Sequence, residues 1–388
     1  MKGIRMVLEL REIFPQMKNF EILEKLKGYS AEKILFLIGN INYYLKSGKN
    51  DLEILTEYFS YEKPDVFSST ILRILKSNNA STRFSLFSER VNLEFMTIVL
   101  SNYDTINKST HNKGSIQDFL IVYLKLNETS FGEDQTEFDS LENKYFYEFS
   151  HIVFTAKLYD TFRPKNIAYQ LLKIKTLFHY YYKNHPSILQ EFYSNNNIKN
   201  SDIWFGEILT FLTQQKLSTI SYIDVKNEVL RNYFDDILIN SSLNKNIVKE
   251  DIKRNPILKI NNDYLILDWN YFFIGFYYKL NFELFKLYRK AVKEISFPDY
   301  KSLMSKKIGE EILFRYLIEL NSPEAKNHIC KLFDSKVDGF PDCYLRIGYK
   351  IFIIEFKDYD IEDRLLDSYN FSDLKKSIDE RFVRKKRS

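Results

Sequence analysis

The stretch PDCYLRIGYKIFIIEFKD, residues 341–358, has the pattern of two short apolar β-strands joined by a tight turn. CYLRI and KIFII are rich in β-branched, aliphatic and aromatic residues, and Gly348 lies between them at a turn position. Because IFII is apolar at every position, it predicts a strand that is buried on both faces. The hairpin nevertheless carries acids at its open end, with Asp342 before the first strand and Glu355, followed by Lys357, after the second.

Antiparallel pairing predicts that these charged residues converge. Side chains alternate along a strand, so Glu355 and Lys357 share a face with Ile351 and Ile353. The first strand begins where the second ends, which brings Asp342 close to Glu355. Two carboxylates at one point repel unless a divalent cation such as Mg²⁺ lies between them. A bound metal lowers the pKa of a water and neutralises a phosphate, and a lysine can orient or deprotonate that water. For the Glu-x-Lys pair alone, a structural ion pair is the alternative interpretation.

This pattern resembles the PD-(D/E)XK nuclease superfamily over roughly residues 300–375. The matching residues are Asp342 after a proline, a hairpin, and then Glu355, Phe356 and Lys357. The resemblance implies a restriction-endonuclease-like α/β core and a Mg²⁺ or Mn²⁺ ion. It also implies that the metal is held by the two acids and the main-chain carbonyl of Phe356, with Lys357 as the catalytic lysine.

The resemblance also implies a third acid from the preceding helix. The segment SKKIGEEILFRYLIEL, residues 305–320, supplies Glu310 and Glu311. We favour Glu311 as a metal ligand and catalytic residue, and Glu310 stays the alternative. Many relatives place this acid further past the glycine, where this chain has leucine and phenylalanine. A core-facing row is expected on the same helix at Ile308, Ile312, Tyr316 and Leu320.

The first part of the chain has a helical pattern. Apolar residues recur at three- and four-residue steps in the segments 30–48, 68–77, 88–103, 115–126, 146–162, 165–184 and 201–216. In 30–48, for example, Ser30 is in an N-cap position and Gly48 marks the end. The apolar face of this helix is expected to consist of Ile34, Leu35, Ile38, Ile41 and Tyr44.

The overall prediction is an α+β fold in three consecutive parts. Residues 1–250 form an all-α bundle or array that senses a partner protein or nucleic acid. Residues 251–295 form a β-hairpin around Asn261 and an aromatic helix over 268–293. Residues 296–388 form the nuclease-like α/β core. Only one helix, within 371–388, follows the Glu-x-Lys pair, so we expect either a short sheet or a truncated sequence.

Composition narrows the class of protein. The 388 residues are 45% hydrophobic and 28% charged, with a net charge of +4 that permits nucleic-acid binding without requiring it. The two cysteines form no zinc or disulfide pattern, the five histidines have no metal-ligand spacing, and no phosphate-binding glycine loop occurs. The first residues do not form a signal peptide, and no apolar block reaches the roughly 20 residues of a membrane span. We therefore expect a cytoplasmic protein that is not in the membrane.

These observations lead to two expected functions. The first is a Mg²⁺-dependent endonuclease that hydrolyses phosphodiester bonds of DNA, with RNA as the alternative substrate. The layout of 255–320 resembles nucleases of bacterial anti-phage defence and mobile-element loci, which implies such a role. The second is a catalytically silent nuclease-fold module that binds nucleic acid or a partner protein. The basic end of the chain, from Arg381 to Arg387, could contact phosphates or simply be solvated.

Overall fold

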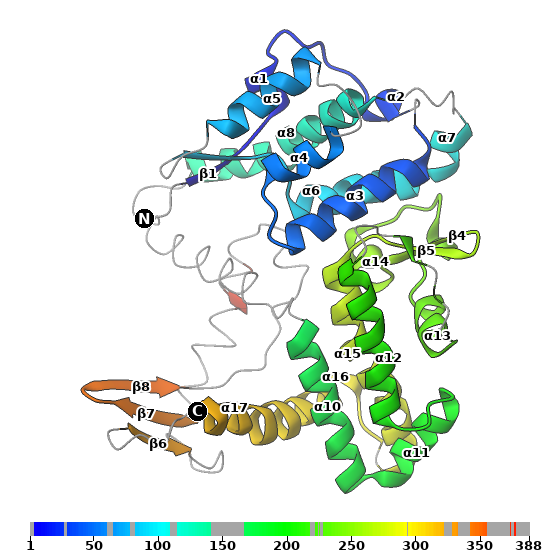
Figure 1. The fold of residues 1–388 in the computed structure, drawn as a ribbon, viewed down its shortest axis with the longest axis vertical. Coiled ribbons are helices and arrows are strands. Elements are labelled where there is room, and N and C mark those ends of the chain that lie inside the picture. The colour runs from blue at the N-terminus through cyan, green and yellow to red at the C-terminus, as the bar shows by residue number, and fades with distance from the viewer. Residues whose placement is uncertain are drawn as a thin grey trace. The chain divides into compact units, whose positions relative to one another are not determined.

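The computed structural model describes residues 4–26, 29–59, 65–77, 82–108, 115–140, 167–217, 222–223, 225, 228–292, 294–321, 328–332, 342–354, 373 and 376–377. Helices make up most of this part of the chain, and its strands form small sheets (Figure 1). This agrees with the predicted α+β class at its coarsest level. No helix in the described ranges combines the length and the apolar character that crossing a membrane requires.

The chain divides into two compact units, and each joins two separate stretches. Unit 1 consists of Met1–Tyr145 and Trp204–Gly275, and unit 2 of Phe146–Ile203 and Phe276–Ser388. Packing between distant stretches, and not sequence order, therefore builds both. The three consecutive parts expected from the sequence stay a prediction.

Unit 1 is mainly helical. Its helices are α1 (Leu10–Ile13), α2 (Ile22–Leu26), α3 (Ala31–Lys46), α4 (Asp51–Phe59), α5 (Val66–Lys76), α6 (Glu89–Ser101), α7 (Tyr103–Lys108), α8 (Ile116–Ser140), most of α12 (Ser201–Leu217), α13 (Glu228–Asp236), the 3₁₀-helix η2 (Asn240–Ser242), α14 (Lys249–Arg254) and the start of α15 (Trp269–Ala291). Its strands are β1 (Ile4–Val7), β2 (Thr82–Ser85), β3 (Tyr222–Ile223), β4 (Ile257–Ile260) and β5 (Asp263–Ile266). Most of the predicted helical segments are present, and 146–162 lies outside the described residues.

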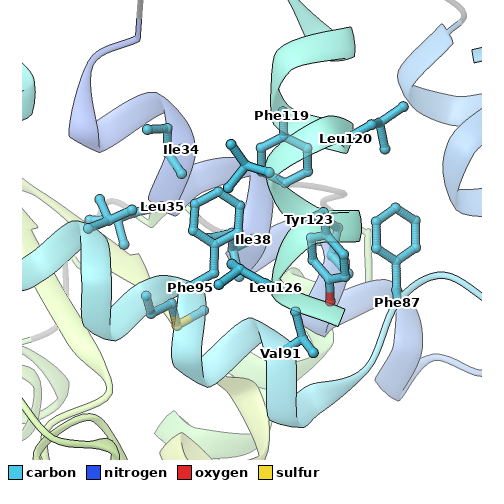
Figure 2. Packing of buried hydrophobic residues seen from close by; sticks show 14 of the residues in the cluster. Ile34, Leu35, Ile38, Phe87, Val91, Phe95, Phe119, Leu120, Tyr123 and Leu126 are labelled. Atoms are coloured by element: carbon cyan, nitrogen blue, oxygen red, sulfur yellow. The ribbon is translucent and has the colours of Figure 1, made fainter. Parts of the chain in front are cut away.

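Helix α3 shows why the periodic segments become helices. The Ser30 hydroxyl accepts a hydrogen bond of 3.2 Å from the Lys33 amide and caps the first turn, as predicted. The helix ends at Lys46, and Gly48 follows with φ of 83°. All five residues of the predicted apolar face are buried. They pack with α6 and α8 into one core, in which the rings of Phe95 and Phe119 stack (Figure 2).

A chain of buried amides and a phenol crosses this core. The hydroxyl of Tyr123 donates to Asn92 at 2.5 Å, and Asn92 donates to Asn42 at 2.6 Å. Asn42 in turn donates to the carbonyl of Leu267 at 2.9 Å, just before α15. A buried polar group is costly unless it is hydrogen-bonded. The chain of bonds therefore ties α8, α6 and α3 to the start of α15 in one relative position.

The prediction that residues 1–250 are all helical is wrong. β1 pairs in parallel with β2, with Ile4 opposite Thr82, and β3 pairs with β5. These strands have two to four residues, too short for alternation to distinguish them from helix ends. The predicted hairpin is confirmed: β4 and β5 are antiparallel, and Asn261 begins their turn with φ of 55°.

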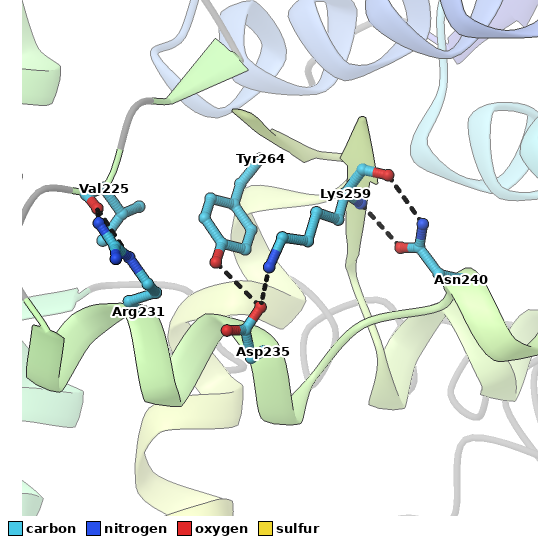
Figure 3. Close-up of polar contacts among 6 residues, drawn as sticks. All are labelled: Val225, Arg231, Asp235, Asn240, Lys259 and Tyr264. Carbon is cyan, nitrogen blue, oxygen red and sulfur yellow. Dashed lines mark hydrogen bonds and ion pairs between the residues drawn. The ribbon is translucent and has the colours of Figure 1, made fainter. Parts of the chain in front are cut away.

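Helix α13 is fastened to this hairpin by polar contacts (Figure 3). Lys259 Nζ lies 2.7 Å and the Tyr264 hydroxyl 2.9 Å from the same oxygen of Asp235. Burial alone would raise the pKa of Asp235, but the hydrogen bonds from Lys259 and Tyr264 outweigh it and lower that pKa. The Asn240 side chain also exchanges two hydrogen bonds with the main chain of Lys259. The charges of Asp235 and Lys259 therefore form a structural ion pair between α13 and the hairpin.

Unit 2 contains the region of the expected nuclease core. Its elements are α10 (Ile167–Asn184), α11 (Pro186–Asn195), the larger part of α15, α16 (Phe297–Met304), the π-helix η3 (Ser305–Phe314), α17 (Arg315–Asn321), β6 (His328–Leu332), β7 (Cys343–Ile347) and β8 (Lys350–Ile354). The predicted aromatic helix is confirmed as α15. The three strands form one antiparallel sheet in the order β6-β7-β8.

The helix that carries the predicted third acid is a π-helix over its first ten residues. Hydrogen bonds from residue i to i+5 widen each turn beyond 3.6 residues. Buried residues consequently begin to recur at steps of four and five, at Met304, Ile308 and Leu313, and Gly309 and Phe314 beside them are buried as well. The expected row of core-facing residues is therefore wrong after Ile308. Tyr316 is 51% and Leu320 66% exposed. A 3.6-residue period places them in the row, but the preceding turns of this helix are wider than 3.6 residues.

Candidate functional site

The predicted hairpin of CYLRI and KIFII is present as the antiparallel pair β7 and β8. Cys343 lies opposite Ile354 and Ile347 opposite Lys350, so the strands pair along their whole described length. Gly348 occupies the turn with φ of 60°, a conformation that favours glycine. The Arg346 side chain donates to the Gly348 carbonyl at 3.0 Å and closes the turn. The local pattern of the sequence therefore sets both the strands and their register.

The prediction that strand β8 is buried on both faces is wrong. On one face Ile351 is 56% and Ile353 72% exposed, and on the other Phe352 is 45% exposed. β8 is the edge strand of the described sheet and has one hydrogen-bonded neighbour. An apolar run shows that burial would stabilise a strand, but whether another layer covers it depends on residues far away in the sequence.

The two faces of the hairpin differ. Opposed residues of an antiparallel pair project to the same side of the sheet. The Cys343 face, which also carries Leu345 and Ile354, is at least partly covered, and Cys343 itself is 0% exposed. The Ile353 face is defined by Tyr344, Arg346, Ile351 and Ile353, and it carries the two most exposed hydrophobic side chains of the two strands, Ile351 and Ile353. The Cys343 face is thus covered at the open end of the hairpin and exposed toward the turn, where Phe352 is 45% exposed, whereas the Ile353 face is exposed up to the open end.

Asp342 lies immediately before β7 and is half-buried. It is the residue next to Cys343, whose partner Ile354 is the last described residue of β8. Glu355, Phe356 and Lys357 lie outside the described residues. The structure therefore places the open end of the hairpin next to Asp342, and the three other predicted residues of this end stay predictions.

The predicted third acid, Glu311, forms an ion pair within η3. Lys307 Nζ lies 3.0 Å and 2.9 Å from the two carboxylate oxygens of Glu311. Hydrogen bonding to Glu311 raises the pKa of Lys307. Burial raises the pKa of Tyr180. The positive charge of Lys307 lowers this pKa and the negative charge of Glu311 raises it. η3, which carries the ion pair, packs against α10, and Tyr180 lies in the last third of that helix. Glu310, the alternative acid, is half-buried on the same helix.

A buried chain of hydroxyls holds the helices around η3 in place. Tyr181 of α10 and Tyr300 of α16 lie with their hydroxyl oxygens 2.8 Å apart. Tyr300 donates to the side-chain oxygen of Asn281 on α15 at 3.2 Å. All three residues are at most 1% exposed, and burial raises the pKa of both tyrosines. Because α16 runs directly into η3, these bonds support the segment that carries Glu311.

The described residues provide ligands of the type that Mg²⁺ prefers but not a complete metal site. Glu311 and Asp342 carry carboxylate oxygens, which suit a hard divalent cation. No group of three or more histidines, cysteines or acids that could hold an ion occurs within the described ranges. Both oxygens of Glu311 already accept hydrogen bonds from Lys307. A metal at Glu311 would therefore have to displace the Lys307 ammonium group or share the carboxylate with it.

Two neighbours of the site were missed in the sequence. Lys307 precedes Glu311 by four residues, a spacing that brings oppositely charged side chains together on a helix and could have revealed the pair. Tyr180 is more than 120 residues away from both in the sequence, and its position depends on how α10 packs against η3. No sequence signal marks that contact.

Comparisons with protein-family models, with curated proteins and with solved structures gave no match for this chain.

Proposed function

We propose that this chain is a metal-dependent nuclease that hydrolyses phosphodiester bonds of DNA. The observation that carries the proposal is the register of β7 and β8, in which Cys343 opposes Ile354 at the open end of the hairpin. Continuing this antiparallel register by one residue on each strand would bring Asp342 opposite Glu355. Both side chains would then project from the Ile353 face, together with Lys357 two residues further on.

The proposed roles follow from the chemistry of these residues. Asp342, Glu355 and the Phe356 carbonyl would hold Mg²⁺ or Mn²⁺, with Glu311 as a further ligand. When bound, such an ion lowers the pKa of a water and neutralises charge on the scissile phosphate. Lys357 would orient or deprotonate the attacking water and offset negative charge in the transition state. The exposure of the Ile353 face supports this assignment, since a polymeric substrate needs an accessible surface.

A plasmid-nicking assay tests the proposal. The wild-type chain should nick DNA with Mg²⁺ and not with EDTA. Asp342→Asn, Glu355→Gln and Lys357→Ala should each reduce the rate at least about 100-fold, the usual range for removing a group that acts on a proton or a developing charge. Lys350→Ala is the matched control because this exposed lysine lies on the same hairpin, away from its open end. Nicking that survives the first three changes would refute the assignment.

Two further comparisons refine the test. Glu311→Gln and Glu310→Gln, measured side by side, distinguish the two candidates for the third acid. A labelled RNA in place of the plasmid distinguishes the two substrate classes. If RNA is cut and DNA is not, the choice of DNA is wrong while the hydrolytic assignment stands.

One observation favours the second candidate function, a catalytically silent module that binds a partner. β8, the edge strand of the described sheet, exposes Ile351, Phe352 and Ile353, and exposed apolar residues on an edge strand favour association with another chain. For this function the expected result is binding of nucleic acid or protein by the full-length chain, without cleavage at any Mg²⁺ or Mn²⁺ concentration.

A further inference from the structure

Helix α10 carries a stripe of basic and aromatic side chains on its exposed side. Lys175, His179, Tyr182 and Lys183 are all exposed, and Tyr182 has 70% of its surface accessible. They are spaced i, i+4, i+7 and i+8, which confines them to an arc of about 100° on a helix. We call these four residues the α10 stripe.

Helix α10 itself supplies no acid that could compensate the charge of the α10 stripe. The helix sequence IAYQLLKIKTLFHYYYKN contains three lysines and one histidine but no aspartate or glutamate. Neither Lys175 nor Lys183 forms an ion pair within the described part of the chain. Other lysines of unit 2 do, since Lys290 pairs with Glu191 at 3.5 Å. A concentrated positive surface of this kind suits a polyanion.

The stripe lies on a firmly packed helix. The opposite side of α10 carries Ile174, Leu177 and Tyr181, all 0% exposed. The hydroxyl of Tyr181 is bonded to Tyr300, as described above. A surface held in this way needs little reordering when it binds a ligand, which lowers the entropic cost of binding.

The helix that carries the stripe also contacts the segment that carries the candidate catalytic acid. α10 packs against η3, and the charges of Lys307 and Glu311 act on the pKa of Tyr180 in α10. Tyr180 is next in sequence to His179, a member of the stripe. The stripe therefore lies on the helix that packs against the segment carrying Glu311.

We propose that the α10 stripe binds a single-stranded segment of the nucleic-acid substrate. Lys175 and Lys183 contact two phosphates of the strand, and the exposed ring of Tyr182 stacks on an unpaired base. The two lysines are eight residues apart, or about 12 Å along the helix axis, so they reach different phosphates of one strand. The inference takes the class of its ligand from the proposed function, but it concerns binding and not hydrolysis.

The test is equilibrium binding of the full-length chain to short fluorescein-labelled single-stranded DNA, followed by anisotropy in EDTA so that no cleavage occurs. Each phosphate contact contributes about 0.7 to the slope of log K against log salt for single strands, so Lys175→Gln/Lys183→Gln should lower the slope by about 1.4. The affinity at about 0.1 M salt should then fall roughly 25-fold. Tyr182→Ala should weaken binding at least about fivefold and leave the slope unchanged.

A matched control removes the same charge elsewhere. Lys76 and Lys108 are exposed lysines at the ends of α5 and α7 in unit 1, and Lys76→Gln/Lys108→Gln should change the affinity less than about twofold. Equal effects of the two double variants would overturn the proposal, because they would reflect net charge alone. Binding to anionic lipid vesicles but not to DNA would also overturn it.

The outcome is separable from that of the proposed function. If the wild-type chain fails to cut nucleic acid but binds single strands through the α10 stripe, the proposed hydrolysis is wrong and this inference stands. If Glu355→Gln abolishes cleavage while Lys175→Gln/Lys183→Gln binds like the wild type, the inference is wrong and the proposed function stands. Duplex binding that ignores Tyr182 would refute the single-strand assignment.

Discussion

The buried hydroxyl chain in unit 2 allows a quantitative prediction about the helices that support Glu311. Tyr300→Phe removes one oxygen and leaves the ring, so no large cavity forms. Tyr300 has one hydroxyl hydrogen and donates it to Asn281, so Tyr181 must donate to Tyr300. The substitution therefore leaves the Tyr181 donor and the Asn281 acceptor without their partner, where each residue is at most 1% exposed.

The magnitude follows from these contacts. Leaving a buried polar group unsatisfied costs about 1–3 kcal/mol, and the 3.2 Å bond to Asn281 is long for two oxygens, so its loss contributes less. We therefore expect Tyr300→Phe to lower the free energy of unfolding of unit 2 by about 2 kcal/mol. Tyr181→Phe leaves the bond from Tyr300 to Asn281 intact, so its cost should be only about 1 kcal/mol.

The assay is urea unfolding followed by pulsed hydrogen exchange and mass spectrometry of peptides from α10 and α16. This readout reports on unit 2, whereas both tryptophans, Trp204 and Trp269, lie in unit 1. The double variant should cost about 1 kcal/mol less than the sum of the two single variants, since one missing bond is common to both. Tyr182→Phe on the same helix is the control and should be neutral, because its side chain is exposed. Additive costs, or a Tyr300→Phe cost equal to the control, would refute the hydroxyl chain.

Three further predictions concern the rest of the chain. Asp235→Asn should destabilise unit 1 by about 0.5–1 kcal/mol at neutral pH by removing the partly exposed ion pair with Lys259. The folded-state pKa of Asp235 is lowered, so the difference in stability should be fully present above the unfolded pKa of about 3.9 and should vanish as the pH falls through the lower folded pKa. Urea titrations at several pH values measure this difference, and a difference independent of pH would contradict the assigned cause. Phe95→Ala should lower the free energy of unfolding of unit 1 by about 3–5 kcal/mol, since Phe95 is 0% exposed. Thermal unfolding followed by tryptophan fluorescence measures this loss, and a loss near that of an exposed residue would place Phe95 outside the core. Ile353→Lys should change the free energy of unfolding of unit 2 by less than about 0.5 kcal/mol, because the side chain is 72% exposed. The hydrogen-exchange assay measures this change, and a loss of several kcal/mol would show that the Ile353 face is covered.

The candidate site illustrates how far local sequence patterns reach. The hairpin, its turn and its register follow from CYLRI, Gly348 and KIFII, because neighbouring residues in the chain determine them. The environment of Glu311 does not follow from local pattern alone. Its ion pair with Lys307 lies within a π-helix, and that segment packs against α10, a helix more than 120 residues earlier in the chain.

The sequence by itself determined the strongly periodic helices such as α3, α10 and α15, the two hairpins and the Ser30 cap on α3, because hydrogen bonding within a few residues and apolar periodicity specify them. Only the tertiary structure decided which apolar surfaces are covered. It buries Leu313 and exposes Leu320 on one continuous helix, and it exposes Ile353 in a strand whose composition predicts burial. Burial depends on which distant segments pack against a surface, and on whether the local helix has 3.6 residues per turn or more.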